Sequence, residues 1–166
     1  MAFVVNSPGA INVELNHKRN LDVLVLENGR KGKLDIYVHI DYKYKKLKSI
    51  LDKLGGIDIA IINTNWTSID IDKRDEYGDA INFENPSKAI LINASKLLLG
   101  KQLDRKFYFQ LVLQSNKTIT LEDYIEIELR YNQDKKIKNR IMKSLVSILI
   151  KTSLGKYKVI NNQKDE

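Results

Sequence analysis

Two runs of alternating side chains set the tightest limit on how this chain can fold. In residues 107–114 the four odd-numbered positions are large and apolar, and in residues 124–131 Ile, Ile, Leu and Tyr recur at every second position. Successive side chains of a strand point to opposite faces, so each run predicts a strand with one face toward a core. Turn residues lie between the runs, at 115–117 and at 122–123. We therefore predict that the two strands pair antiparallel as a long hairpin.

Further strand patterns, separated by turn residues, occur along the rest of the chain. The segments expected as strands are residues 3–5, 11–15, 21–27, 33–42, 57–62, 89–92 and 156–160. Residues 21–27 and 33–42 are joined by a loop with two glycines, which predicts a second hairpin. The segment at 89–92 is expected to lead into one helical turn that Asn93 or Ser95 caps. The last segment, 156–160, carries two lysines and predicts an edge strand.

Two segments change to helical spacing. Residues 43–54 predict an amphipathic helix that Gly55 ends, and residues 134–152 predict a second one with an isoleucine and leucine stripe. The second half of this helix is almost uncharged, which predicts that it is buried. The expected fold class is α+β: mainly antiparallel β, a sheet or sandwich of hairpins, with the two amphipathic helices packed against it.

The length of 166 residues is enough for one domain with its own core. We expect a single globular domain over residues 1–160 and a flexible polar tail over 161–166. The chain has no cysteine, and its N-terminus lacks the basic and apolar regions of a signal peptide. These features predict a soluble protein, cytoplasmic or part of a virion, with no membrane partner and no secretion through a signal peptide.

Residues 63–85 are polar and hard to assign. They contain the only tryptophan and an acidic cluster, and the spacing of the acids does not fit a calcium-binding EF-hand loop. We interpret the segment as a long surface loop or flap that serves interaction, with an irregular strand at residues 69–71 as the alternative. The residues expected to act there are Trp66, Asp70, Asp72, Asp75, Glu76 and Asp79.

Positive charge is concentrated near the C-terminus. Residues 134–158 carry eight basic and one acidic group, whereas residues 1–133 carry 19 and 18. A localised basic surface is typical of nucleic-acid binding, although only six of the 28 basic residues are arginine, the better residue for bidentate phosphate contacts. The candidate nucleic-acid contacts are Lys135, Lys136, Lys138, Arg140 and Lys143 on the second helix and Lys43, Lys45, Lys46 and Lys48 on the first.

Catalytic signatures are missing from the sequence. It contains no Walker A loop, no GxGxxG after a strand, no GxSxG elbow and no HExxH helix. The nearest approach to a metal-dependent nuclease is the set Asp41, Glu126 and Glu128, and His39 with Asp41 is the nearest approach to a two-residue metal site. These acids alternate with core residues in the way of ordinary outward strand positions. We predict no enzyme activity, no cofactor and no metal.

The composition is rich in Lys, Ile and Asn, and in this it is similar in style to small head or tail proteins of phages with AT-rich genomes. The similarity covers no motif. The first prediction is a non-catalytic structural or assembly subunit of a larger complex, such as a phage-like virion component, which contacts other protein subunits as a homo- or hetero-oligomer. The alternative is a nucleic-acid-binding protein that uses the basic helices, and the second alternative is the nuclease.

Overall fold

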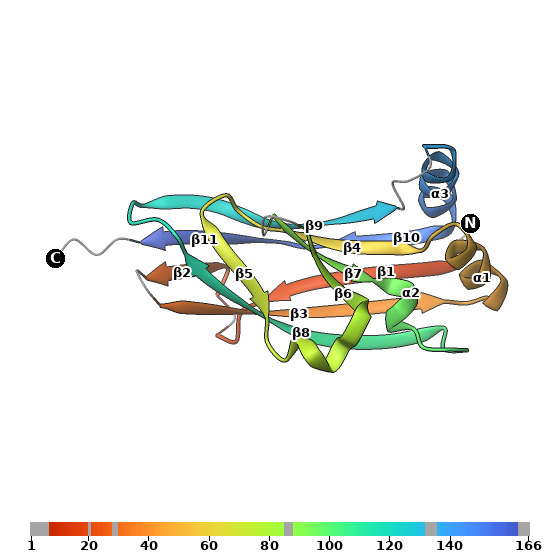
Figure 1. Ribbon diagram of the computed structural model, residues 1–166, viewed down its shortest axis with the longest axis horizontal. Helices are drawn as coiled ribbons and strands as arrows, with labels where there is room; N and C mark the ends of the chain where they lie inside the picture. Colours follow the sequence, from red (N-terminus) through yellow and green to blue (C-terminus); the bar gives the residue numbers. More distant parts are fainter. Residues whose placement is uncertain (1–6, 20, 28–29, 85–87, 132–135, 163–166) are drawn as a thin grey trace, which may run out of the picture.

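The computed structural model describes residues 7–19, 21–27, 30–84, 88–131 and 136–162, which form a β-sandwich of two mixed sheets (Figure 1). Sheet A has the order β10 (Ile150–Leu154), β1 (Gly9–Asn16), β3 (Lys31–Tyr42), β8 (Asp104–Ser115) and β5 (Thr67–Ile71). Sheet B has the order β2 (Val23–Glu27), β11 (Lys156–Asn162), β9 (Leu121–Tyr131), β4 (Ile57–Ile62), β7 (Ala89–Asn93) and β6 (Ile81–Glu84). The β1–β10 and β2–β11 pairs are parallel and the other pairs are antiparallel.

The predicted alternation places one face of each long strand in a shared core. Phe109, Leu111 and Leu113 of β8 are fully buried, as are Ile125 of β9 and Ile59 of β4. The buried apolar side chains of both sheets form one cluster. The mainly antiparallel fold class is thus confirmed in its coarse form: the described chain is mostly β, and its helices are few and short. The predicted strand at residues 3–5 lies outside the described residues.

Both predicted hairpins are wrong in their pairing. β8 lies in sheet A between β3 and β5, whereas β9 lies in sheet B between β11 and β4. In the same way β2 belongs to sheet B and β3 to sheet A. Each predicted hairpin is therefore a connection from one sheet to the other. A strand with alternating residues needs an apolar surface opposite its inner face. Two consecutive strands can bury these faces as neighbours in one sheet or as members of two sheets that pack face to face, so the alternation does not distinguish the two arrangements.

The chain passes between the sheets again at Gly155, between β10 and β11. The amide of Gly155 donates to the carbonyl of Val13 at 2.9 Å, and a Cβ on this glycine would lie 3.2 Å from the same oxygen. Because of this crossing β11 lies inside sheet B, so the predicted edge strand at 156–160 is wrong. The strand also continues to Asn162, and the buried Asn161 side chain donates to two loop carbonyls. Residues 161 and 162 therefore belong to this strand and not to the predicted tail, and residues 163–166 lie outside the described residues.

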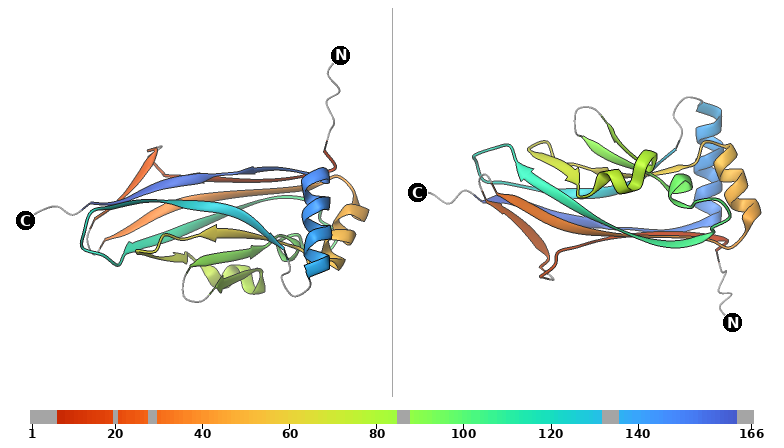
Figure 2. Two further views of the ribbon diagram at one scale, coloured as in Figure 1. Left: turned by 90° about the horizontal axis from the view of Figure 1, so that it is seen from above. Right: turned by 60° about the horizontal axis from the view of Figure 1, so that its bottom comes forward.

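Four helical elements complete the described chain. They are α1 (Lys45–Lys53), the 3-10 helix η1 (Arg74–Ala80), α2 (Ala94–Leu97) and α3 (Lys136–Leu149). The turn after β7 is confirmed, because the Asn93 side chain accepts a hydrogen bond from the amide of Lys96. α1 and α3 lie side by side at one end of the sandwich in both views of Figure 2, which agrees with the prediction that they pack against the sheet or sandwich, although neither covers a sheet face. Among the described helices, none has the length and apolar character that crossing a bilayer requires.

Candidate interaction surfaces

Helix α1 has one buried face and one exposed face. Leu47 and Leu51 pack into the core, four residues apart on the same side of the helix. Tyr44 and Ile50 remain 60% and 41% exposed. The helix ends where Gly55 takes a positive φ of 113°, a conformation that favours glycine. The helix predicted from the sequence is confirmed here.

Helix α3 exposes the apolar residues that were expected to be buried. Its buried residues are Met142 and Val146, whereas Ile137 and Ile148 are each 75% exposed and Ile141 is 46% exposed. The three isoleucines are four and seven residues apart, so they form one stripe along the outer side of the helix. The predicted burial of the second half is therefore wrong for Ile148. The predicted end is also wrong, since the helix stops at Leu149 and β10 begins at Ile150.

The two helices carry the whole net charge of the protein. Together α1 and α3 contain eight basic residues and one acid, Asp52, a net charge of +7. The full chain has 28 basic and 21 acidic residues, also +7, so the remainder has 20 of each. We call the exposed residues of α1 and α3 the helical end. It combines an isoleucine stripe with a concentrated positive charge.

The structure brings most of the predicted basic contacts together at this end. Lys45, Lys46 and Lys48 lie on α1, with Lys43 just before it, and Lys136, Lys138, Arg140 and Lys143 lie on α3. Lys135 lies outside the described residues. Among those that the structure describes, Lys48 differs because its ammonium group pairs with the Asp52 carboxylate at 2.9 Å. Sequence reasoning found the charges but not the exposed isoleucines between them.

The predicted interaction loop at 63–85 is largely regular structure. β5 pairs with β8, and its residues Thr67, Ile69 and Ile71 are buried. Trp66 is only 6% exposed and belongs to the core, so its predicted role at an interaction surface is wrong. The sequence indicated this strand only as an alternative at residues 69–71, because the surrounding polar residues obscure the alternation of Thr67, Ile69 and Ile71.

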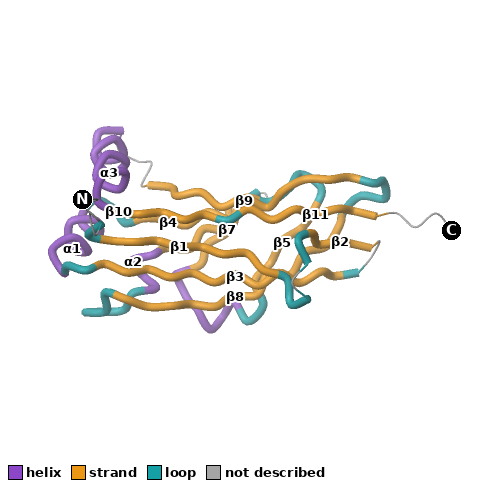
Figure 3. Tube along the Cα trace, turned by 180° about the vertical axis from the view of Figure 1, so that it is seen from behind, coloured by secondary structure: helices purple, strands orange, loops and turns teal. Residues whose placement is uncertain are grey.

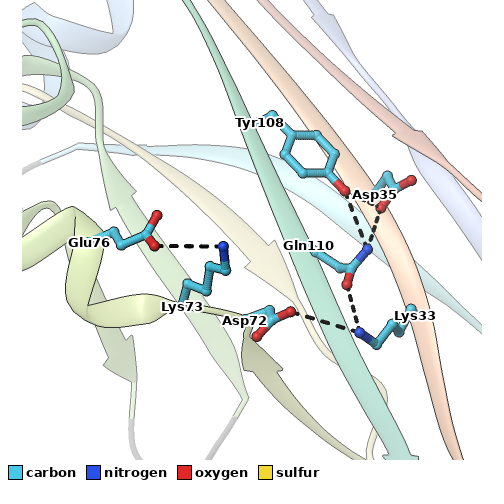
Figure 4. A network of polar contacts seen from close by, with 7 residues as sticks. All are labelled: Lys33, Asp35, Asp72, Lys73, Glu76, Tyr108 and Gln110. Atoms are coloured by element: carbon cyan, nitrogen blue, oxygen red, sulfur yellow. Dashed lines mark hydrogen bonds and ion pairs between the residues drawn. The ribbon is translucent and has the colours of Figure 1, made fainter.

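The acidic residues of this segment do lie on the surface. Asp70, Asp72, Asp75, Glu76 and Asp79 are all exposed, at the edge of sheet A and on η1. Two of them contact lysines, as Figure 4 shows: Asp72 lies 3.8 Å from Lys33, and Glu76 lies 3.8 Å from Lys73. The segment from Asp70 to Asp79 holds five acids and two basic residues, a net charge of −3. We call it the acidic edge.

A polar network covers the outer face of sheet A beside this edge (Figure 4). The Asp35 carboxylate is 6% exposed and accepts hydrogen bonds from the Tyr108 hydroxyl at 2.7 Å and the Gln110 amide at 3.0 Å. The hydrogen bond to Asp35, followed by burial, raises the pKa of Tyr108 to about 12. Lys33 donates to the other end of the Gln110 amide at 2.9 Å. The network holds its polar groups in mutual contact.

The acids considered for metal chemistry are not brought together. Asp41 lies on β3 of sheet A, whereas Glu126 and Glu128 lie on β9 of sheet B. Glu128 accepts a hydrogen bond from Arg130 at 2.5 Å. His39 pairs with Asp104 of the neighbouring strand, with 2.7 Å between His39 Nε2 and the carboxylate. Within the described ranges no three His, Cys, Asp or Glu side chains are grouped so that they could hold a metal ion.

Comparison with known proteins gives only distant likenesses. No protein-family model matches the chain, and no curated protein matches it. Among solved structures, CaCohA2 from Clostridium acetobutylicum has a TM-score of 0.43 at 9% identity, over 92% of this chain and 91% of that chain. The seventh ScaB type I cohesin from Pseudobacteroides cellulosolvens has a TM-score of 0.40 at 10% identity, over 94% of each chain. The PapD-like domain 7 of human CEP192 has a TM-score of 0.38 at 10% identity, over 100% and 94%. Likeness at this level assigns neither a family nor a function.

Proposed function

We propose that this protein is a non-catalytic assembly subunit whose helical end docks on an acidic protein surface. The observation that carries the proposal is the isoleucine stripe of α3, exposed within the surface that holds all of the net charge. Removing apolar side chains from water is the main source of affinity in protein association. The surrounding lysines supply complementarity toward carboxylates, which raises the association rate and selects the partner.

The partner we propose for the helical end is the acidic edge of a second copy. The two surfaces have opposite net charges, +7 and −3, and belong to different elements of the chain. A contact between two different surfaces is heterologous, so it leaves one free surface of each kind on every pair. Repeated contacts of this type build a ring or an open filament, which is the behaviour of a structural subunit.

Multi-angle light scattering across a concentration and salt series tests this proposal. The wild-type mass is expected to rise with concentration at low salt and to fall toward the monomer in about 0.5 M salt, where the Debye length is only a few ångströms. Ile148→Asp should give a monomer, because it places a charge within the stripe. Ile119→Asp is the matched control: Ile119 is also exposed, at 57%, but belongs to the loop between β8 and β9.

A charge exchange identifies the surfaces in contact. Lys136→Glu with Lys143→Glu should abolish self-association, and so should Asp75→Lys with Glu76→Lys. A mixture of the two variants should recover heterodimers, because one intact basic surface then meets one intact acidic surface. A wild-type protein that stays monomeric at high concentration and low salt contradicts the proposal, as does a failure of the mixture to associate.

A more specific form of the proposal is that the protein is a component of a virion. It is supported by the compositional likeness to phage head and tail proteins described above. Detection of the protein in purified particles by mass spectrometry, at a copy number above one per particle, is the expected result. Its absence from particles would limit the proposal to assemblies of another kind.

Nucleic acid is the second candidate partner, and the adjacent basic helices favour it. The helical end contains only one arginine, Arg140, and its exposed apolar side chains are aliphatic. Single-stranded nucleic acids, in contrast, are bound by stacking of the bases on aromatic rings. A gel-shift titration with single- and double-stranded DNA decides the question. Phosphate contact predicts affinity that falls steeply with salt, and no shift at low salt rejects this candidate.

A further inference from the structure

The two sheets leave a seam where the chain passes from β10 to β11. β11 pairs with β9 from Lys156 opposite Glu126 to Asn161 opposite Leu121. In the same register, a straight chain would place the five residues before Lys156 opposite Ile127–Tyr131. Those residues turn instead to sheet A, where β10 pairs with β1. Among the described residues, Ile127–Tyr131 therefore has a strand partner, β4, on one side only.

A groove of about 930 Å³ fills this seam, between β9, β10 and α3. Figure 3 shows that β9 ends and β10 begins at the same end of the sandwich, beside α3. Apolar side chains from all three elements line the groove, among them Leu129, Val146 and Leu154. Leu154 is 36% exposed, although its partner in sheet A, Val13, is buried. The groove thus has two strand edges as walls and a lining of both apolar and polar residues.

We propose that this groove binds an extended peptide segment of a partner, which adds to β9 as a strand in line with β11. Strand edges present backbone donors and acceptors at the spacing of a neighbouring strand, and an extended peptide matches this pattern along its whole length. Its alternate side chains would face the apolar lining and solvent in turn. The segment pairs with about five residues, the length of the vacant edge.

Charge at the rim selects the sequence of the segment. Among the described residues, two carboxylates line the groove, those of Glu84 and Glu128, and both accept hydrogen bonds from Arg130. Lys143 of α3 also lines the groove and has no ion pair among the described residues. The segment is therefore expected to alternate apolar and polar residues and to carry a carboxylate next to Lys143. This inference rests on the proposed function, to which it adds a second mode of partner contact.

A synthetic peptide tests the inference directly. The probe is acetyl-Asp-Val-Thr-Val-Thr-Val-Asp-amide, and binding is measured by isothermal titration calorimetry. Two further peptides carry N-methyl groups either on the three valines or on the two threonines, which removes the amide donors from one edge of the strand at a time. Strand addition predicts that one of these peptides binds about tenfold more weakly or worse, while the other retains the affinity of the probe.

Variants of the protein locate the site. Ser147 lines the groove, whereas Ser144, on the same helix and also exposed, does not. Ser147→Trp should fill the groove and weaken peptide binding at least about tenfold, and Ser144→Trp should leave it unchanged. Replacing both aspartates of the probe by lysine should weaken binding as well. Lack of binding by the probe, or equal binding by both N-methyl peptides, overturns the inference.

The outcome is separable from that of the proposed function. Ile148→Asp, which should abolish self-association, should leave the affinity for the probe intact because Ile148 lies on the outer side of α3. Conversely, a protein that self-associates normally and ignores the probe refutes strand addition alone. A protein that binds the probe and never self-associates refutes the helical-end contact alone.

Discussion

The outer face of sheet A and the helical end are both charged surfaces, but among the described residues most charged groups on sheet A have a partner within the protein, whereas most of those at the helical end do not. On sheet A, Asp35 accepts two hydrogen bonds and Lys33 contacts both Gln110 and Asp72. The helical end has eight basic side chains and one carboxylate, which already pairs with Lys48. A surface that satisfies its own charges gains little from a partner. Unneutralised charge around exposed isoleucines is what identifies a contact surface.

The largest expected effect separates the two faces of α3. Met142→Ala should lower the free energy of unfolding by about 2–5 kcal/mol, because it leaves a cavity in the core. Ile148→Ala, on the exposed side, should change it by less than about 0.5 kcal/mol. Urea unfolding followed by circular dichroism measures both. Equal losses would mean that the isoleucine stripe is covered in the monomer and is not a free contact surface.

The polar network of sheet A should stabilise the fold, unlike the charges of the helical end. Asp35→Ala removes the acceptor of two hydrogen bonds and should cost about 1–3 kcal/mol of unfolding free energy. Asp72→Ala is the matched control, since Asp72 is exposed and its ion pair is long; it should cost less than about 0.5 kcal/mol. If the two variants are equally stable, the hydrogen bonds to Asp35 do not stabilise the fold, and sheet A does not differ from the helical end in this respect.

The pKa of Tyr108 reports the same network without a stability measurement. The hydrogen bond to Asp35 raises this pKa to about 12, compared with about 10 for a free tyrosine. A raised folded-state pKa means that the stabilising contribution is complete below pH 10 and is lost as the pH rises through about 12. The difference in tyrosinate absorbance between wild type and Tyr108→Phe should titrate near pH 12. Asp35→Asn should lower this pKa, and a difference that titrates near 10 in wild type would show the bond to be absent.

The smallest expected effect is at the acidic edge. Lys73→Gln removes the partner of Glu76, but both side chains are exposed and 3.8 Å apart, so the free energy of unfolding should change by less than about 0.5 kcal/mol. The variant should instead strengthen self-association at low salt, because the acidic edge gains one net negative charge. Unchanged association would mean that the partner of the helical end is not the acidic edge.

The β scaffold was largely predictable from the alternating residues, because burial of one strand face is a local property of the sequence. Strand pairing was not predictable in this way. The alternation of β8 and β9 is the same whether they lie edge to edge or face to face, so the predicted hairpin had the right strands and the wrong neighbours. Only residues 69–71 of β5 were considered as a strand, because polar residues surround its three buried positions.

The candidate sites divide along the same line. Clustered lysines were visible in the sequence, since charge is counted residue by residue. The exposure of Ile137 and Ile148 was not, because an apolar stripe on a helix has the same pattern whether it meets a core or solvent. The seam between β9 and β10 depends on the crossing at Gly155. Residues before this glycine pair with β1 of sheet A, although the free edge of β9 in sheet B could also have paired with them.

By itself, then, the amino-acid sequence determined which segments are strands and helices, which strand faces are apolar and where the positive charge is concentrated. Only the tertiary structure decided which strands are neighbours, that both basic helices share one end, and which apolar residues remain outside the core. The physical reason is that periodicity and charge act over a few residues, whereas pairing and burial depend on surfaces supplied by residues far away in the chain.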